Sequence, residues 1–88
     1  MPRYIIERNV AGLKLEDLAE AGKKSNEVLA GMKGVTWIRS YISEVEGKIY
    51  CEYEAPDKDA VREHARLAGL PADVITEIAI EINPAMFQ

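Results

Sequence analysis

Two alternating runs of residues follow one another in the middle of the chain, over residues 35–44 and 47–54. Apolar and polar side chains alternate over most of each run, which is the pattern of a strand with one buried face. Glu46 and Gly47 stand where the runs meet, and a glycine in this place is typical of a hairpin turn. The centre of the chain is therefore predicted to be an antiparallel hairpin, to which the flanking segments add their own elements.

The flanking segments predict two helices and two further strands. Apolar and small residues at helical spacing predict a helix over residues 15–31, and Pro56, Asp57 and Gly69 delimit a second helix over residues 57–68. A β-branched run over residues 3–8 and an alternating run over residues 75–82 predict the remaining strands. The order βαββαβ predicts a ferredoxin-like α+β fold, in which both helices cover one face of a four-stranded antiparallel sheet.

Length and composition limit the classes of protein. With 88 residues, the chain is expected to form a single ferredoxin-like domain over residues 1–88. The net charge of −4 argues against a nucleic-acid partner, because phosphates require a basic surface. No apolar run approaches the roughly 20 residues that span a bilayer, and the N-terminus lacks the apolar core of a signal peptide. We therefore expect no membrane partner and a cytoplasmic location, with which the single cysteine agrees.

The uncovered face of the sheet and the C-terminal tail predict a homodimer. A chain this short buries a modest share of its surface, and the helices are expected to leave one sheet face open. Met86 and Phe87 follow a helix-breaking proline and have no core of their own. We therefore expect a second copy of the chain to cover the open face in a dimeric α+β barrel, with the tail lying on the partner subunit.

A register for the hairpin follows if Glu46 and Gly47 form a two-residue turn. The resulting pairs are Val45 with Lys48, Ile42 with Cys51, and Ser40 with Tyr53. The face beneath the helices is then expected to receive Ile38, Ile49, Ile78, Ile80 and Ile82 as well. The open face is expected to receive Trp37, Arg39, Tyr41, Ser43, Tyr50, Glu52, Glu54, Glu77, Ala79 and Glu81.

The only cysteine and the only histidine of the chain both face the predicted core. Cys51 lies on the helix-covered face in this register, and His64 falls on the apolar stripe of the second helix. The two side chains therefore aim at the same layer and could meet. Two unrelated core residues are the more common arrangement, because a buried cysteine packs as a small hydrophobe. A lone histidine is usually hydrogen-bonded to a hydroxyl, such as that of Ser40 or Tyr53.

The segment WIRSYISEVEGKIYCEYEAPDKDAVREHARLAGLPAD, residues 37–73, closely resembles the signature of a family of small bacterial domains. Uncommon residues recur in order and carry the resemblance: Trp37, Ser40, Tyr41, Tyr50, Cys51, Ala55, Pro56, Arg62, Glu63, His64, Ala65, Gly69, Leu70, Pro71, Asn83 and Pro84. The family includes a cytoplasmic nickel-binding protein with a dimeric ferredoxin-like fold. The resemblance therefore implies this fold, self-association and nickel as the bound metal.

The resemblance also raises Cys51 and His64 to expected metal ligands. Thiolate and imidazole are donors that suit nickel, copper or zinc. Two protein ligands are too few for tight binding, so Glu63, Ser40, Tyr53 or groups of a second subunit would complete the shell.

Three functions stay open at this point. The first is a non-enzymatic metal-binding or metal-buffering protein, with nickel as the first candidate. The second is a small enzyme, in which His64 is the acid or base and Tyr41 or Tyr53 a hydroxyl that positions the bound group. The third is a ligand-binding or interaction module in which Cys51 and His64 belong to the core. The Glu-rich open face offers a further place for a cation or for a charge-paired contact between subunits.

Overall fold

The computed structural model describes residues 1–12 and 14–88, without the side chain of Leu15. Its elements are β1 (Arg3–Asn9), α1 (Leu15–Ala30), β2 (Thr36–Ser43), β3 (Lys48–Glu54), α2 (Lys58–Ala68), β4 (Val74–Ile78) and the short 3₁₀ helix η1 (Pro84–Phe87). Helices and strands thus follow in the predicted order βαββαβ. No helix in the described ranges is long and apolar enough to cross a membrane.

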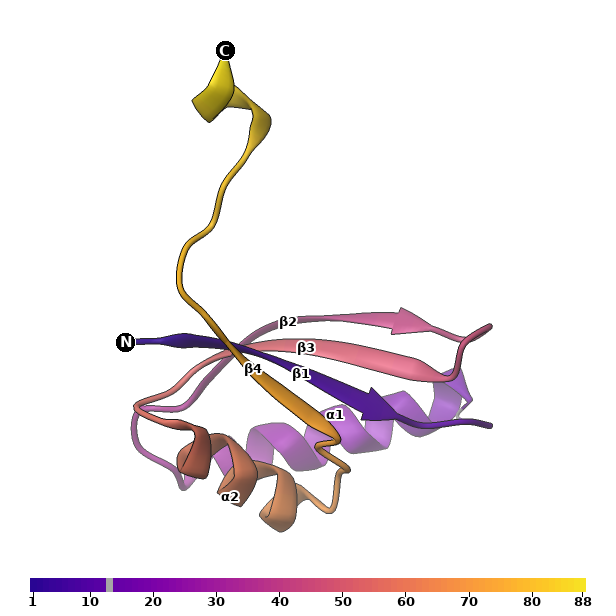
Figure 1. The fold of residues 1–88 in the computed structure, drawn as a ribbon. Coiled ribbons are helices and arrows are strands. Elements are labelled where there is room, and N and C mark those ends of the chain that lie inside the picture. Colours follow the sequence, from indigo (N-terminus) through magenta and orange to yellow (C-terminus); the bar gives the residue numbers. More distant parts are fainter. Residues whose placement is uncertain (13) are drawn as a thin grey trace.

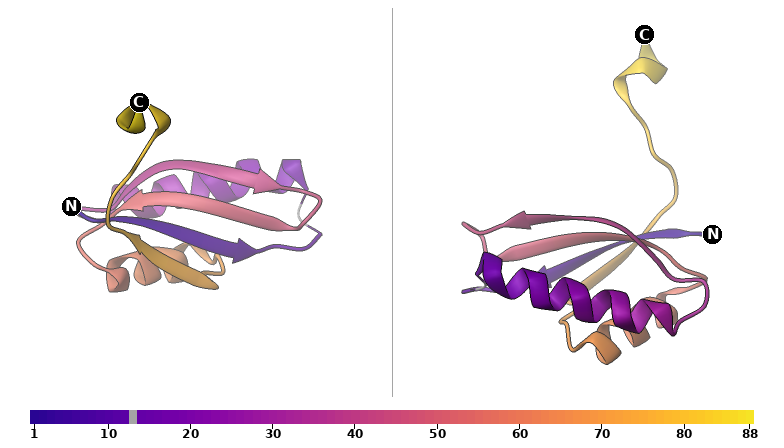
Figure 2. Two further views of the ribbon diagram at one scale, coloured as in Figure 1. Left: turned by 45° about the horizontal axis from the view of Figure 1, so that its top comes forward. Right: turned by 180° about the vertical axis from the view of Figure 1, so that it is seen from behind.

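The strands form one antiparallel sheet in the order β2-β3-β1-β4 (Figure 1). Both α-helices lie against one face of this sheet, and no α-helix of the described residues covers the opposite face (Figure 2). β1 pairs with β3 on one side and with β4 on the other, so the first strand is central. This is the ferredoxin-like α+β architecture that the sequence predicts.

The second helix begins and ends at the predicted signals. Asp57 is its N-cap, and the carboxylate accepts a hydrogen bond from the backbone N–H of Ala60 at 2.8 Å. Gly69 follows the last turn with a φ of 69°, a left-handed conformation that favours glycine. Between these ends, His64 and Val61 lie on the buried side of the helix. The caps therefore set which residues α2 turns toward the sheet.

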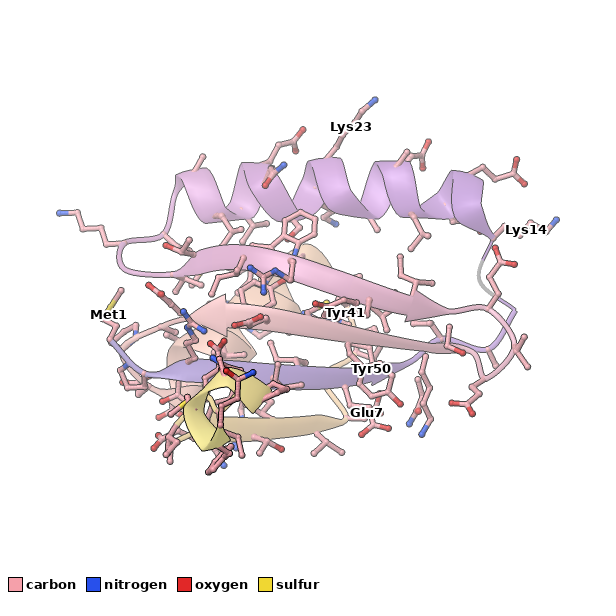
Figure 3. All side chains as sticks on the ribbon, turned by 90° about the horizontal axis from the view of Figure 1, so that it is seen from above. Met1, Glu7, Lys14, Lys23, Tyr41 and Tyr50 are labelled. Carbon is pink, nitrogen blue, oxygen red and sulfur yellow. The ribbon has the colours of Figure 1, made fainter. Side chains whose placement is uncertain are left out.

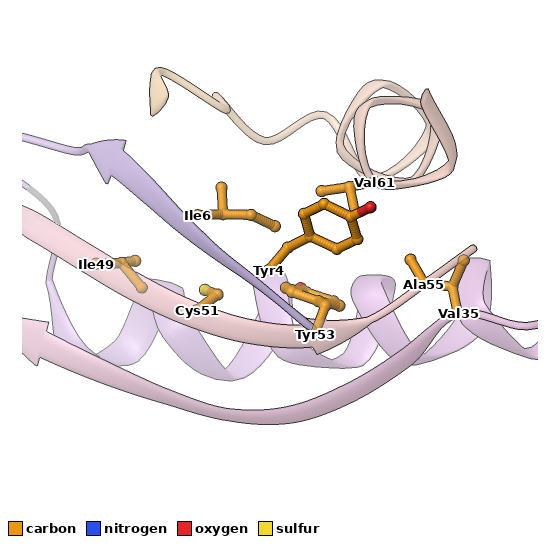
Figure 4. Packing of buried hydrophobic residues seen from close by; sticks show 8 residues of the cluster. All are labelled: Tyr4, Ile6, Val35, Ile49, Cys51, Tyr53, Ala55 and Val61. Carbon is orange, nitrogen blue, oxygen red and sulfur yellow. The ribbon is translucent and has the colours of Figure 1, made fainter. Parts of the chain in front are cut away.

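The core lies between the helices and the sheet and takes its largest members from the two central strands. β1 contributes Tyr4 and Ile6, and β3 contributes Ile49, Cys51 and Tyr53 (Figure 4). Within each strand these are every second residue, because successive side chains of a strand point to opposite faces. The other buried apolar residues are Val35, Ala55, Val61, Ala65 and Ala68. Cys51 is therefore a core residue, as its place in the alternating pattern predicts.

The open face of the sheet is charged and aromatic. Arg3 and Arg39 flank Glu52, and their guanidinium nitrogens lie 3.2 and 3.4 Å from its two carboxylate oxygens. Glu52 is buried although it points away from the helices, because these neighbours cover it. Tyr41 pairs with Tyr50 on the same face (Figure 3).

The hairpin register differs from the predicted one by two residues. A four-residue turn over residues 44–47 joins β2 to β3 in place of the expected two-residue turn. The observed pairs are Ser43 with Lys48, Ile42 with Ile49, Tyr41 with Tyr50, and Ser40 with Cys51. A shift of two residues keeps every side chain on its face, so Cys51 still points toward the helices. The predicted pairing of Ile42 with Cys51 was therefore wrong, whereas the predicted side of both residues is correct.

A bulge in β2 places Trp37 on the side opposite to the predicted one. The register shifts between Trp37 and Arg39, so that Trp37 pairs with Tyr53 and Arg39 with Glu52. Trp37 therefore shares the helix-covered face with Cys51, and its ring lies close to Gly22 of α1. An extra residue in one strand reverses the alternation on one side of it, and the alternating pattern alone does not reveal it.

The last strand is shorter than predicted, and the side chains that it turns toward the helices are the opposite set from the predicted one. β4 ends at Ile78 rather than at residue 82, and its register pairs Glu77 with Tyr4 and Ile75 with Ile6. Ile75 and Glu77 thus face the helices, and Ile78 faces the open side. Glu77 stays exposed there because β4 is at the edge of the sheet, and the hydroxyl of Tyr4 donates to its carboxylate at 3.3 Å. The predicted orientation of this strand was wrong, since it assumed that the isoleucines must be inside.

The residues after β4 extend away from the body of the domain. They leave the sheet on the side of its open face and end in η1 (Figures 1 and 2). Ile80, Ile82, Met86 and Phe87 are all more than half exposed. The predicted inward positions of Ile80 and Ile82 are therefore also wrong, because the chain has left the sheet before it reaches them.

Two glycines of the helices are expected to respond oppositely to alanine. Gly22 lies inside α1, where an added Cβ would lie 3.8 Å from the ring of Trp37, an ordinary contact. Gly22→Ala should raise the free energy of unfolding by about 0.5–1 kcal/mol, because glycine costs that much inside a helix. Gly69→Ala is the matched control and should lower it, since Gly69 has a φ of 69°. Urea denaturation followed by circular dichroism measures both, and a loss at Gly22 would contradict the packing of α1.

Candidate functional site

A cavity lies between α1 and the sheet and is partly open to solvent. Its volume is about 170 Å³. Most of the wall is apolar and consists of Leu18, Ala21, Gly22, Trp37, Ile42, Ile49 and Leu70. The polar groups of the wall come from Arg8, Ser25, Ser40, Cys51 and Tyr53. An apolar pocket with a few convergent polar groups is the usual form of a small-molecule site.

Cys51 contributes a free thiol to this wall. Ser40 lies opposite it on β2, and the Ser40 hydroxyl donates to Cys51 Sγ at 3.0 Å. Trp37 in turn donates from its indole Nε1–H to Ser40 Oγ at 2.9 Å. A short chain of hydrogen bonds thus orients the sulfur, and all three of its members line the cavity.

His64 connects the two helices inside the protein. Its Nε2 lies 2.9 Å from Ser25 Oγ on α1, and its ring packs against that of Tyr53 with the centroids 5.2 Å apart. Nδ1 is buried and has no hydrogen-bond partner in the described part of the chain. Burial lowers the pKa of the imidazole, the positive charge of Arg8 lowers it further, and an interaction with the backbone of Ser25 opposes both. The imidazole is therefore neutral at neutral pH.

Cys51 and His64 belong to one polar cluster and are joined to it by different partners. Tyr53 is close to both, because it is the next residue on the same face of β3 after Cys51 and its ring lies against His64. The sulfur is hydrogen-bonded to Ser40, and the imidazole to Ser25. Of the sequence-predicted residues, the structure brings Cys51, Ser40 and Tyr53 to the cavity wall, with His64 packed against Tyr53.

Tyr41 and Glu63 lie outside this cluster. Tyr41 is 62% exposed on the open face of the sheet, because it follows Ser40 in the strand and so points the other way. Glu63 precedes His64 on α2 and accepts a hydrogen bond from Arg66 Nε at 3.0 Å. This hydrogen bond lowers the pKa of the Glu63 carboxyl. The geometry therefore does not join either residue to the predicted site.

Two polar residues of the cluster, Arg8 and Ser25, were not among the predicted site residues. Arg8 is only 1% exposed, although it carries a charge. Its guanidinium donates to the carbonyl oxygen of Pro71 and, from the other terminal nitrogen, to the Tyr53 hydroxyl at 3.5 Å. The sequence did contain a signal, because Arg8 is two positions after the core residue Ile6 and so shares its face.

The cluster offers a metal ion only part of a ligand set. In the described residues, no three His, Cys, Asp or Glu side chains are grouped so that they could hold one ion. Cys51 and His64 are nevertheless donors of the right chemistry, and the unpartnered Nδ1 of a neutral imidazole is what a metal requires. Any metal held here would need further ligands from outside this chain.

Similarity to known proteins covers most of the chain. A family model described as "Nickel responsive protein SCO4226-like" matches residues 4–78. The crystal structure of SCO4226 from Streptomyces coelicolor A3(2) superposes with a TM-score of 0.81 at 25% sequence identity, covering 91% of this chain and 99% of that chain. A structural-genomics structure of protein YJCS shares the fold, with a TM-score of 0.54 at 18% identity and coverage of 92% and 100%. No curated protein matches the chain.

The buried histidine predicts a loss of stability in mild acid. His64 is the only histidine, and its pKa is lowered in the folded protein, so its contribution is complete above the ordinary value of about 6.5. As the pH falls below that value, the unfolded chain takes up a proton that the folded chain resists, and the free energy of unfolding should fall. Urea denaturation between about pH 7.5 and 5 measures this slope. His64→Gln should flatten it, and an unchanged slope in that variant would contradict the assignment to His64.

Proposed function

Because the chain belongs to the family of SCO4226-like nickel responsive proteins, we propose that it is a non-enzymatic protein that binds nickel. The observation that carries the proposal is the polar cluster, which holds one free thiol and one neutral imidazole. Cys51 and His64 would be the protein's metal ligands, with the hydroxyls of Ser40 and Tyr53 beside them. The partly open cavity gives Cys51 a route to solvent.

An incomplete ligand set suits a protein that exchanges its metal. Structural metal sites are closed by four protein ligands, whereas two leave positions for solvent or for another molecule. Nickel bound in this way would be taken up and released as its concentration changes. Such behaviour agrees with a family that is described as nickel responsive.

The contacts of His64 favour binding over catalysis. A general base must reach the substrate proton directly or through one water. Nε2 of His64 is already hydrogen-bonded to Ser25, and His64 is not one of the described residues that line the cavity. The Tyr53 hydroxyl is likewise held by Arg8. These contacts support a non-enzymatic role.

The protein would act as a homodimer in the cytoplasm. The tail after β4 carries four exposed apolar side chains and leaves the domain on the side of the open sheet face. A second copy offers an identical tail and an identical open face, so two copies could cover each other symmetrically. The free thiol of Cys51 agrees with a reducing compartment.

Nickel titration of the untagged protein tests the metal site. Isothermal titration calorimetry should show binding that Cys51→Ser and His64→Gln each weaken by about tenfold or more, since each removes one of two soft donors. The double variant should lose little more than either single one, because both residues act on one ion. Affinity should also fall below about pH 6, where protons compete for the imidazole and the thiolate.

Glu63→Gln is the matched control for this titration, because Glu63 carries a metal-binding group outside the cluster. It should bind nickel as the parent does. If both single variants also bind nickel as the parent does, the metal site lies elsewhere, and the acidic open face becomes the place to search.

Substitutions in the tail test the dimer. Ile80→Asp combined with Phe87→Asp should convert the protein to a monomer, because charged side chains in place of these exposed apolar ones would be buried on the partner. Sedimentation velocity at micromolar concentration measures the change. Val45→Asp is the control, since Val45 is 98% exposed in the hairpin turn and should not affect assembly. A monomeric parent protein would refute the proposed dimer.

A further inference from the structure

Arg8 brings a positive charge to the cavity wall without a carboxylate to balance it. A guanidinium stays protonated at any pH at which the protein is folded. Arg8 is 1% exposed, and no carboxylate of the described residues lies within 4.0 Å of its nitrogens. Buried charges are normally paired, because removal from water without a counter-charge is costly.

The hydrogen bonds of Arg8 are all to neutral groups. One terminal nitrogen donates to the carbonyl of Pro71, and the other reaches the Tyr53 hydroxyl at 3.5 Å, the long end of a hydrogen bond. Nε is buried and has no partner in the described part of the protein. The guanidinium therefore keeps donor capacity that its own chain does not use.

Nearby acidic residues are committed to other partners. Glu7, on the opposite face of β1, accepts from Lys48 Nζ at 2.7 Å. Asp73 accepts from the backbone N–H of Asn9 at 2.7 Å. The remaining polar groups of the cavity wall are hydroxyls and a thiol, which are no counter-charge in their neutral form. An anion from outside the chain would supply what the arrangement lacks.

We propose that the cavity binds a small organic carboxylate, whose carboxylate group pairs with Arg8 and whose apolar body fills the space beneath α1. The planar fork of a guanidinium matches a carboxylate in two parallel hydrogen bonds. Arg8 is the only cationic side chain among the described lining residues, so a single negative charge is balanced and a phosphate dianion is not.

The size and lining of the cavity determine the size and polarity of the part of the ligand beyond its carboxylate. Leu18, Trp37, Ile42 and Ile49 offer apolar surface and no charge. The cavity of about 170 Å³ is comparable with engineered cavities of about 150 Å³ that accommodate benzene. A compact body of the size of one aromatic ring or a short alkyl chain therefore fits. This site goes beyond the proposed nickel binding and needs no metal.

Benzoate and benzamide form a matched pair of probes, because they share shape and differ in charge. Calorimetric titration of the full chain in the presence of a metal chelator should show benzoate binding at least about tenfold tighter than benzamide. Equal binding of the two probes would overturn the proposal. Binding of benzoate only after nickel is added would overturn it as well, since the metal and not Arg8 would then hold the carboxylate.

Variants of Arg8 separate a ligand-binding role from a purely structural one. Arg8→Met should abolish the preference for benzoate and leave the melting temperature equal or higher, because it replaces an uncompensated buried charge by an apolar side chain of similar length. Arg8→Lys keeps the charge and loses the fork, so benzoate should bind several-fold more weakly. Retention of the full preference in both variants would overturn the proposal, and so would a lower melting temperature of Arg8→Met together with an unchanged preference.

Two control variants complete the test. Arg62→Met removes an exposed guanidinium on α2 that is paired with Asp59, and it should leave both affinities unchanged. Ala21→Leu adds apolar volume to the cavity wall, and it should abolish binding of both probes while the circular dichroism spectrum stays that of the parent. Undiminished benzoate binding to Ala21→Leu would place the site outside the cavity and overturn the proposal.

Discussion

The antiparallel pairing of β1 with β3 is the constraint on which the rest of the structure depends. It aligns Tyr4 with Tyr53 and Ile6 with Cys51, so that the inward side chains of the two central strands form the layer on which the helices pack. The same alternation continues to Arg8, which reaches back across the layer to the hydroxyl of Tyr53. Core and polar cluster are therefore parts of one set of side chains. A substitution that alters one of them changes the surroundings of the other.

Local patterns were sufficient to predict the order of the elements, because helix caps and alternation depend on neighbouring residues. They also predicted the side of Cys51, since the error in the hairpin register was an even number of residues. The bulge after Trp37 and the orientation of β4 could not be predicted in this way. Both depend on how neighbouring strands pair, such as the register of β1 with β4 that sets Glu77 opposite Tyr4.

The candidate site was predictable only where its members are neighbours on one face of the hairpin. Ser40 and Tyr53 lie beside Cys51 for that reason, whereas the partner of His64 depends on where α1 passes α2. Arg8 was not predicted as a site residue, because a charged residue in a strand is expected to face water. Its burial breaks that rule and puts a positive charge into the cavity wall, where no described lining residue is acidic. A wall of this kind would favour an anionic ligand over a neutral one.

The bulge in β2 has a spectroscopic consequence. Trp37 is the only tryptophan of the chain, and the bulge turns it from the open face to the cavity wall. Its indole N–H is hydrogen-bonded to Ser40, the same hydroxyl that contacts the sulfur of Cys51. Indole fluorescence responds to the polarity around the ring and to the partner of its N–H. The unmodified protein thus carries its one tryptophan in the wall of the cavity, and selective excitation of this indole, apart from the four tyrosines, reports the filling of that space without a label.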